Sequence, residues 1–436
     1  MKPSTTIAKK RLVLYFQVHQ PLRLNKLNFF EIGQNKSYFN EDLDRRIIQR
    51  VAAECYLPAN QMLIDLSRKV SGLRVAFSIT GQALRQLAKY VPGVIESFKR
   101  LHETGCVEFL GETSHHSLAS LHPSDEFPEQ VREHLELMQH HFGVRPTVFR
   151  NTELVYSNSI GSRVAQLGYK GMLIDGVDRV MRGRTQYQVY QHPFQDNFNL
   201  LIRANNLSDD IGFRFIEGKN KLSVGKYFQW LNQVPDNNGV ITLGMDYETF
   251  GEHKKRDTGI IEFLRDLIVT IDREKALRMV TPSEAFATQE VKDRLDIPDF
   301  ISWADQDKDL SAWLGNEAQK DAFQHLYGLE ETVKKSLGTE MLETWRSLQT
   351  SDHLYYMSTK TQADGSVHSY FSPYTSPYEA FINYMNILND FKLKLKKAPH
   401  EEHLETVEYE RRHQDMPEWA REQYAEGFGH NSLINH

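Results

Sequence analysis

One apolar stretch ends in a carboxylate at Phe149-Arg150-Asn151-Thr152-Glu153, and a second ends the same way at Leu243-Gly244-Met245-Asp246. Both have the composition of a buried strand that gives way to a polar loop. A carboxylate at such a position is costly unless partners or function hold it there. Two carboxylates at equivalent ends of parallel strands can face one another, as nucleophilic and acid–base catalysis by a carboxylate pair requires.

Similar apolar runs recur along the chain, with amphipathic helical stretches between them. The strands are predicted at residues 11–19, 73–80, 106–111, 147–153, 171–175, 199–203 and 240–248, and helices at 41–69, 82–102, 124–142 and 159–167. This alternation predicts a parallel sheet covered by helices on both faces. Seven strands are too many for a small sandwich and favour a closed or nearly closed α/β barrel, with active-site residues at the carboxyl ends of the strands.

The pattern changes after Pro298, where residues 307–397 show helical spacing and little strand signal. The sequence therefore predicts a barrel over residues 1–297 and a helical bundle over 298–398 that completes the active-site cleft. Residues 399–436 are rich in charge and are predicted to form a solvated helix or tail.

The bulk composition is that of an ordinary globular protein, with 40% hydrophobic and 25% charged residues. The 52 basic and 58 acidic residues give a net charge of -6, which argues against a nucleic-acid or anionic-membrane partner. No segment has the roughly 20 apolar residues that cross a bilayer. Two cysteines, Cys55 and Cys106, without a secretory signal favour a cytoplasmic location.

Histidines follow two of the predicted strands. His19 begins His19-Gln20-Pro21 at the end of the first, and His115 and His116 follow the third. Imidazoles can hold sugar hydroxyls, or with Asp246 they can bind a metal as in polysaccharide deacetylases. Adjacent histidines point apart in a strand, so the metal hypothesis is the weaker one. Each carboxylate could also have a purely structural partner, such as Arg150 for Glu153.

Five segments resemble, in order, the motifs of glycoside hydrolase family 57, most of all its α-amylase branch. They are Tyr15-Phe16-Gln17-Val18-His19-Gln20-Pro21, Gly105-Cys106-Val107-Glu108-Phe109-Leu110-Gly111, Phe149-Arg150-Asn151-Thr152-Glu153, Asp246-Tyr247-Glu248-Thr249-Phe250-Gly251 and Ser351-Asp352-His353-Leu354-Tyr355-Tyr356-Met357. His-Gln-Pro alone is a weak signal, but five motifs in order are a strong one. The resemblance implies an incomplete (β/α)7 barrel of parallel strands followed by a C-terminal α-helical bundle.

The resemblance also implies a retaining mechanism on α-1,4-glucans or maltooligosaccharides. Glu153 is then the nucleophile and Asp246 the general acid/base, with no metal or cofactor required. The substrate-binding residues that it implies are His19, Gln17, Glu108, His116, Phe250, His253, Trp313, Asp352 and His353.

The chain departs from the family pattern at two positions. Gln17 stands where many members have a histidine, and His253 stands where many have a tryptophan that could stack on a sugar. Both bear on whether water or a sugar takes the intermediate. A 4-α-glucanotransferase or branching enzyme therefore stays open beside the hydrolase, as do a metal-dependent deacetylase and a silent glucan-binding protein. The oligomeric state is left open.

Overall fold

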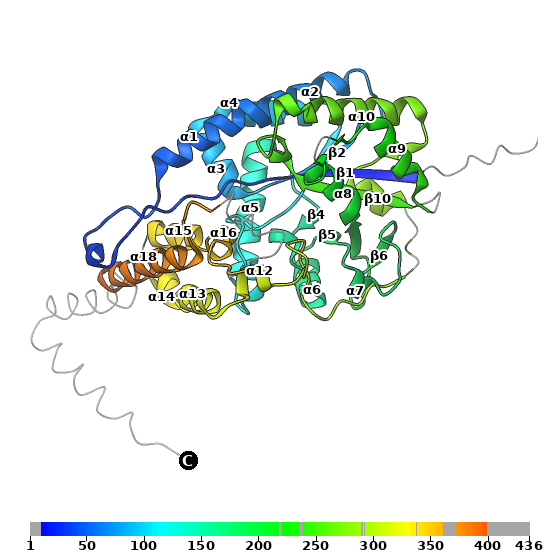
Figure 1. The fold of residues 1–436 in the computed structure, drawn as a ribbon. Coiled ribbons are helices and arrows are strands. Elements are labelled where there is room, and N and C mark those ends of the chain that lie inside the picture. Colours follow the sequence, from blue (N-terminus) through cyan, green and yellow to red (C-terminus); the bar gives the residue numbers. More distant parts are fainter. Residues whose placement is uncertain are drawn as a thin grey trace, which may run out of the picture.

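The computed structural model describes residues 10–217, 220–235, 239–288, 291, 293–336, 338–360 and 372–398. Its centre is a sheet in which seven parallel strands follow the order β3-β2-β1-β10-β7-β5-β4 (Figure 1). Their bounds are β1 (Lys10–Val18), β2 (Val75–Ile79), β3 (Val107–Phe109), β4 (Val148–Arg150), β5 (Gly171–Asp175), β7 (Asn199–Arg203) and β10 (Val240–Asp246). All seven predicted strands are present, within a few residues of the predicted ends.

The two outer strands of this order meet just beyond β3. The Gly111 N–H donates to the Val148 carbonyl at 2.9 Å, and the Arg150 N–H donates to the Gly111 carbonyl at 2.8 Å. The sheet therefore closes through a single bridge rather than a full strand pair, which confirms the incomplete (β/α)7 barrel. Two further strands of this sheet were not predicted: β13 (Leu277–Met279) pairs with the first residues of β1, and β6 (Val189–Gln191) lies antiparallel to β7.

A small apolar core fills the barrel and two larger cores lie outside it. Alternate residues such as Val13, Tyr15, Leu173 and Leu201 point inward, because successive side chains of a strand face opposite sides. The helices α1 (Glu41–Val51), α2 (Leu57–Ser67), α3 (Gly81–Tyr90), α4 (Pro92–Glu103), α9 (Val224–Gln233) and α10 (Ile260–Glu274) pack over one outer core, with α5 (Glu126–Phe142) and α6 (Asn158–Gln166) beside the other.

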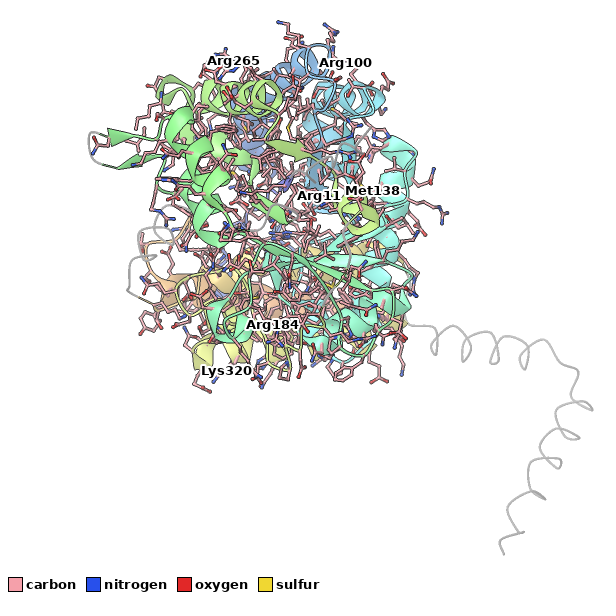
Figure 2. The ribbon with its side chains drawn as sticks, turned by 90° about the vertical axis from the view of Figure 1, so that its right-hand side faces the viewer. Arg11, Arg100, Met138, Arg184, Arg265 and Lys320 are labelled. Atoms are coloured by element: carbon pink, nitrogen blue, oxygen red, sulfur yellow. The ribbon has the colours of Figure 1, made fainter. Side chains whose placement is uncertain are left out.

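The helices α1, α2 and α10 lie across the top of Figure 1, and α6 and α7 (Asp178–Met181) lie below the strands. Figure 2 places Arg100 of α4 and Arg265 of α10 at one edge of the molecule, and Arg184 and Lys320 toward the opposite edge. Of these residues, Arg100, Arg265 and Lys320 occupy the outer faces of helices whose inner faces are apolar, as the amphipathic pattern predicts.

Beyond the barrel the chain is helical. It forms α12 (Ser311–Leu314), α13 (Glu317–Tyr327), α14 (Glu330–Lys335), α15 (Thr339–Leu348), α16 (Ser351–Tyr355) and α18 (Pro377–Lys397). An isolated bridge between Ser117 and Thr350 ties this region to the loop after β3. The exact domain boundaries stay a prediction, and the predicted tail at 399–436 lies outside the described residues.

Both cysteines are buried and free of a disulfide. In the part of the chain that the structure describes, no helix combines the length and the apolar character that a membrane span needs.

Candidate active site

The carboxyl ends of the barrel strands gather polar side chains around the two predicted carboxylates. Asp246 ends β10 directly opposite Gln17 of β1 in the strand register. Glu153 lies in the short helix η4 (Thr152–Leu154), which follows β4. Glu112 comes one residue after the bridge that closes the barrel at Gly111. Glu153 and Asp246 therefore lie at the carboxyl ends of their strands, as predicted, and belong to one polar cluster.

The backbone at Glu153 is in an unfavourable conformation. Glu153 has φ 54° and Leu154 has φ 52°, both in the left-handed region. Non-glycine residues held there cost of order 1–3 kcal/mol each and are frequent at functional sites. Trp303 holds the turn from outside, because its backbone N–H donates to the Glu153 carbonyl at 3.2 Å. The turn breaks the strand alternation and lets the Glu153 carboxylate enter the cluster.

Two donors hold the Glu153 carboxylate. His116 Nε2 lies 3.1 Å from one carboxylate oxygen, and the Trp303 indole N–H donates to the other at 2.7 Å. Burial by itself raises the pKa of Glu153, but the hydrogen bond and charge of His116, the charge of Arg150 and the Trp303 bond outweigh it and lower that pKa. Glu153 is therefore held ionised, while its side chain remains 21% exposed.

Glu112 holds His116 in turn. His116 Nδ1 lies 2.6 Å from the fully buried Glu112 carboxylate, which also accepts from Ser78 Oγ at 2.7 Å and Gln17 Nε2 at 3.1 Å. Burial opposes the charged imidazole, yet the bonds to Glu112 and Glu153 raise the pKa of His116 to about 9. His116 is thus protonated and donates from both ring nitrogens, which fixes its orientation toward Glu153.

Asp246 has the opposite electrostatic environment. Burial, followed by the negative charge of Glu153, raises its pKa to about 6, against the opposing effects of Arg150, His116 and His19. Asp246 can therefore carry a proton at a pH where Glu153 cannot. Different environments that separate the pKa values of two neighbouring carboxyl groups are the usual basis for assigning acid and nucleophile roles.

A segment of the π-helix η2 (Ala52–Tyr56) supports the turn after Asp246. The Cys55 thiol donates to the Tyr247 carbonyl at 3.0 Å, and the Tyr56 hydroxyl donates to the Glu248 carboxylate. Burial and the charge of Asp246 raise the pKa of Glu248 to about 8. The π-helix interrupts what the sequence predicts as one continuous helix over residues 41–69, and such interruptions are frequent at functional sites.

The helical region contributes Asp352 to the cluster. His19 Nε2 lies 3.0 Å from the Asp352 carboxylate and His19 Nδ1 lies 3.0 Å from Thr80 Oγ1. The His19 ring stacks on His116 with 4.0 Å between centroids. Burial and the charge of His116 lower the pKa of His19. Residues more than 300 positions apart thus meet here, because the Ser117–Thr350 bridge brings α16 over the barrel.

Two arginine side chains lie over the ring of Trp303. The guanidinium groups of Arg150 and Arg203 lie 4.7 and 5.3 Å from the centre of its ring, at cation–π distance. These contacts fix the indole whose N–H donates to Glu153. No local pattern in the sequence indicates this role of Trp303, since it depends on a contact with a residue 150 positions away.

The glycosyl hydrolase family 57 profile matches residues 13–298. The chain belongs to glycosyl hydrolase family 57. This confirms the resemblance seen in the motifs and makes the protein an enzyme of that glycoside hydrolase family. The chain is 39% identical over 401 residues to a Methanocaldococcus jannaschii protein named "Putative alpha-amylase", with 88% of this chain and 84% of that protein covered.

Solved structures that share the fold of this family 57 chain include an α-amylase and a glucanotransferase. The α-amylase AmyC from Thermotoga maritima aligns with a TM-score of 0.61 and 14% identity over 92% of this chain and 96% of its own. The 4-alpha-glucanotransferase from Thermococcus litoralis aligns with a TM-score of 0.56 and 15% identity over 83% of this chain. The family 57 chain spans about half, 54%, of that transferase.

Several residues that the family resemblance implied for substrate binding lie outside the polar cluster around Glu153 and Asp246. Glu108 accepts from the Ser283 N–H at 2.9 Å and from its hydroxyl at 2.5 Å, at the start of α11 (Pro282–Thr288). The structure does not bring Glu108 to the cluster, because its carboxylate holds α11, and its role in substrate binding stays a prediction. The acid of this segment that reaches the cluster is Glu112, four residues later, and its place just past the strand end was the available signal.

Phe250 and Trp313 also lie outside the cluster, and their roles in substrate binding stay predictions. Phe250 is fully buried and packs edge-on against Phe16 at 5.5 Å, so it belongs to the outer core. Trp313 is 1% exposed and packs near Tyr355 at 6.3 Å, so it offers no free ring face. The tryptophan that contacts Glu153 is Trp303.

The two other predicted histidines are buried to different degrees. His353 packs against Tyr384 at 5.8 Å within the helical region, and burial lowers its pKa to about 4. His253 is partly buried beside the Glu248 segment, with its backbone N–H donating to the Glu248 carbonyl at 2.8 Å, and burial lowers its pKa to about 4. Neither has a contact with Glu153 among those described, whereas His19, His116, Gln17 and Asp352 lie in the cluster.

His115 points away from His116, as expected of neighbours. Its Nε2 lies 3.1 Å from Glu343 and its Nδ1 lies 3.8 Å from Glu133. These three could gather around a cation, but Arg85 and Arg346 contact the same acidic cluster. The grouping of His19, His115, His116 and Asp246 that a deacetylase-type metal site would need is therefore not formed.

Proposed function

We propose that this family 57 enzyme is a retaining, α-amylase-like hydrolase of α-1,4-glucans. The observation that carries the proposal is the contrast between Glu153, which is held ionised, and Asp246, whose pKa is raised to about 6. A glycosidase that works with two carboxyl groups needs one that is ionised and one that is protonated. The membership of the chain in family 57, whose motifs imply a retaining mechanism, supports the assignment of the ionised one as a nucleophile. The name of the 39% identical Methanocaldococcus jannaschii relative supports the substrate class.

In the first step, Glu153 attacks the anomeric carbon while Asp246 gives its proton to the departing glycosidic oxygen. This leaves a glycosyl–enzyme ester and an ionised Asp246. In the second step, Asp246 takes a proton from water, which attacks the ester and frees Glu153. His116 keeps Glu153 oriented through both steps because Glu112 anchors its other nitrogen. His19 and Asp352, at the mouth of the cluster, are placed to receive sugar hydroxyls.

Transfer to a second sugar is the competing outcome, since a glucanotransferase shares the fold. Incubation with maltoheptaose and analysis of product lengths separates the two. We expect shorter maltooligosaccharides, with products longer than the substrate absent at early times. Longer products at a rate comparable to that of the shorter ones would show a transferase, and no conversion of any α-glucan would overturn the substrate class.

Activity should depend on pH through the two carboxylates. Asp246 acts as acid only when protonated, so kcat/KM should fall as the pH rises through about 6. Glu153 must be ionised, and because its pKa is lowered, the acid limb should lie below the ordinary range of a glutamate. A profile of kcat/KM against pH on maltoheptaose checks both limbs. Full activity maintained to pH 8 would contradict Asp246 as the acid.

Replacing Trp303 by phenylalanine removes the N–H that donates to Glu153 but keeps an aromatic ring between the arginines. A hydrogen bond to a charged group contributes about 1.5–3 kcal/mol, so kcat/KM should fall about 10- to 100-fold. The pKa of Glu153 should rise, which moves the acid limb of the pH profile to higher pH. Trp230→Phe, on the surface helix α9, is the matched control and should change neither quantity. An acid limb that stays in place would remove Trp303 from this role.

A further inference from the structure

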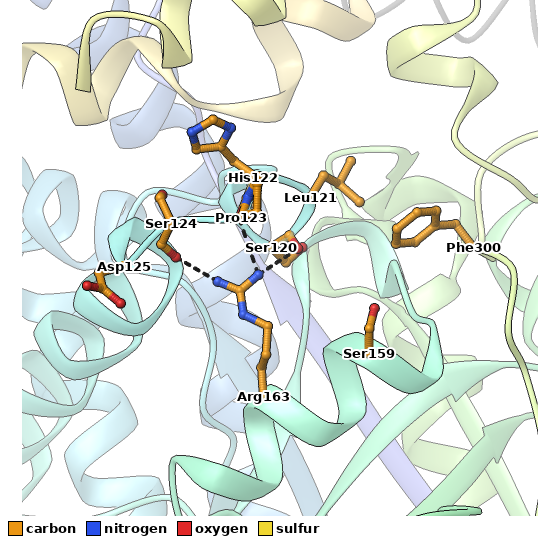
Figure 3. Close-up of a pocket in the computed structure, with 9 residues that line it drawn as sticks. All are labelled: Ser120, Leu121, His122, Pro123, Ser124, Asp125, Ser159, Arg163 and Phe300. Atoms are coloured by element: carbon orange, nitrogen blue, oxygen red, sulfur yellow. Dashed lines mark hydrogen bonds between the residues drawn. The ribbon is translucent and has the colours of Figure 1, made fainter. Parts of the chain in front are cut away.

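A cavity lies beside the loop that follows β3. It is open to solvent on one side and has a volume of about 470 Å³, within the size range of small-molecule sites. Its walls come from the loop after β3, the start of α6 and the segment that leads to Trp303 (Figure 3). The lining residues are Ser120, Leu121, His122, Pro123, Ser124, Asp125, Ser159, Arg163 and Phe300.

The cavity is built by fixed contacts. Arg163 of α6 donates to the carbonyls of Ser120 at 3.1 Å, His122 at 3.3 Å and Ser124 at 2.9 Å, as Figure 3 shows in part. Its guanidinium also lies over the Phe127 ring at 4.9 Å. These bonds hold the loop in one shape, so a ligand would not have to order it.

The helical region holds one of the lining residues, His122, in place. The His122 ring stacks on Tyr327 of α13 with 5.0 Å between centroids, and its Nε2 lies 3.4 Å from the Glu330 carboxylate of α14. Contacts from the barrel and from the helical region thus both hold the residues that line the cavity. The contact between Asp352 and His19 likewise joins the helical region to the barrel.

The lining chemistry suits a neutral, polyhydroxylated ligand. Phe300 exposes 37% of its surface at one side of the cavity and can stack on the apolar face of a sugar. The hydroxyls of Ser124 and Ser159 and the exposed carboxylate of Asp125 can bond sugar hydroxyls. An anion is disfavoured, because Arg163 already donates to three carbonyls and Asp125 adds negative charge.

Short lengths of chain connect the cavity to the catalytic cluster. The Asn151 side chain, two residues before Glu153, donates to Ser120 Oγ at 3.0 Å. Phe300 precedes Trp303 by three residues, so their Cα atoms lie within about 10 Å of one another. The cavity therefore lies only a few residues of chain away from the Glu153 turn on two of its sides.

We propose that this cavity is a distal glucan-binding subsite, in which Phe300 stacks on a glucosyl unit of a chain being cleaved at Glu153. This inference rests on the proposed α-glucan substrate. It predicts that the cavity contributes to long substrates only, because a short one placed at the carboxylates does not reach Phe300.

Phe300→Ala should weaken the binding of maltoheptaose to the inactive Glu153→Gln protein about five- to tenfold, as loss of one aromatic stacking surface does. In the protein with Glu153 intact, the same change should raise KM for maltoheptaose and leave kcat/KM for an aryl maltoside unchanged. Ser159→Leu, which fills the cavity from α6, should act in the same direction. Phe213→Ala, which removes a ring that is 63% exposed outside the cavity, is the control.

The outcomes separate this subsite from the proposed function. Cleavage of maltoheptaose with an affinity that neither Phe300→Ala nor Ser159→Leu changes would overturn the subsite alone. An equal loss on the aryl maltoside and on maltoheptaose would also overturn it, since that is the pattern of a structural defect. A wild-type protein that neither binds nor cleaves α-glucans would overturn both proposals.

Discussion

Replacing Glu153 by glutamine is expected to lower kcat/KM on maltoheptaose by about 10⁴-fold or more, as loss of a catalytic nucleophile does. The amide is nearly isosteric and can still meet Trp303, but it cannot form the glycosyl ester. Initial rates of reducing-end formation measure the loss. A thermal unfolding midpoint close to that of the wild type shows that the turn at Glu153 survives the change.

Glu248→Gln is a sharp control for this experiment. Glu248 is buried two residues after Asp246, and its pKa of about 8 keeps it protonated at neutral pH. Glutamine then replaces a neutral side chain of similar shape, so activity should be largely kept. Comparable losses in Glu153→Gln and Glu248→Gln would point to general disruption of the strand ends rather than loss of a nucleophile.

Replacing Asp246 by asparagine should lower kcat/KM on maltoheptaose by about 10²–10⁴-fold, the usual contribution of a general acid. The loss should depend on the leaving group. An aryl maltoside whose phenol needs no proton should be cleaved in the first step almost normally, so that the glycosyl–enzyme accumulates and a burst of phenol precedes slow turnover. Stopped-flow absorbance records the burst.

Azide separates the roles of the two carboxylates, because it needs no general base to attack. Added to Asp246→Asn, it should speed turnover and give a glycosyl azide of retained α configuration. Added to a Glu153→Gly variant, it should enter from the vacated side and give the β product from an activated substrate. Identical configurations from the two variants would reject the assignment of nucleophile and acid/base.

The architecture was predictable because it follows from local patterns. The seven parallel strands have near-continuous apolar runs, and their alternation with amphipathic helices leaves few topologies. The segment at 171–175, for example, is a strand in the structure with the same bounds. Short strands such as β13 lacked such a signal, since three residues with one exposed arginine do not make a period.

The contacts that surround Glu153 and Asp246 were less predictable. Motif position implied Glu108, but only the alternation of side chains and the packing of α11 decide that Glu108 turns to Ser283. Glu112 and Trp303 act through His116 and Glu153, and these are long-range contacts that no local spacing encodes. Sequence placed the carboxylates at the right strand ends, whereas the partners that separate their pKa values depend on the closed barrel.

The most direct test of the account is to trap the intermediate. A 5-fluoro-α-glycosyl fluoride of a maltooligosaccharide forms the ester readily, since fluoride leaves without a proton, and the ring fluorine slows hydrolysis of that ester. Mass spectrometry of the digested protein should then find the sugar on the peptide that contains Glu153, and no adduct should form in Glu153→Gln. A sugar attached to Asp246 or to another side chain, or turnover of the reagent without any adduct, would contradict Glu153 as the nucleophile of a retaining enzyme.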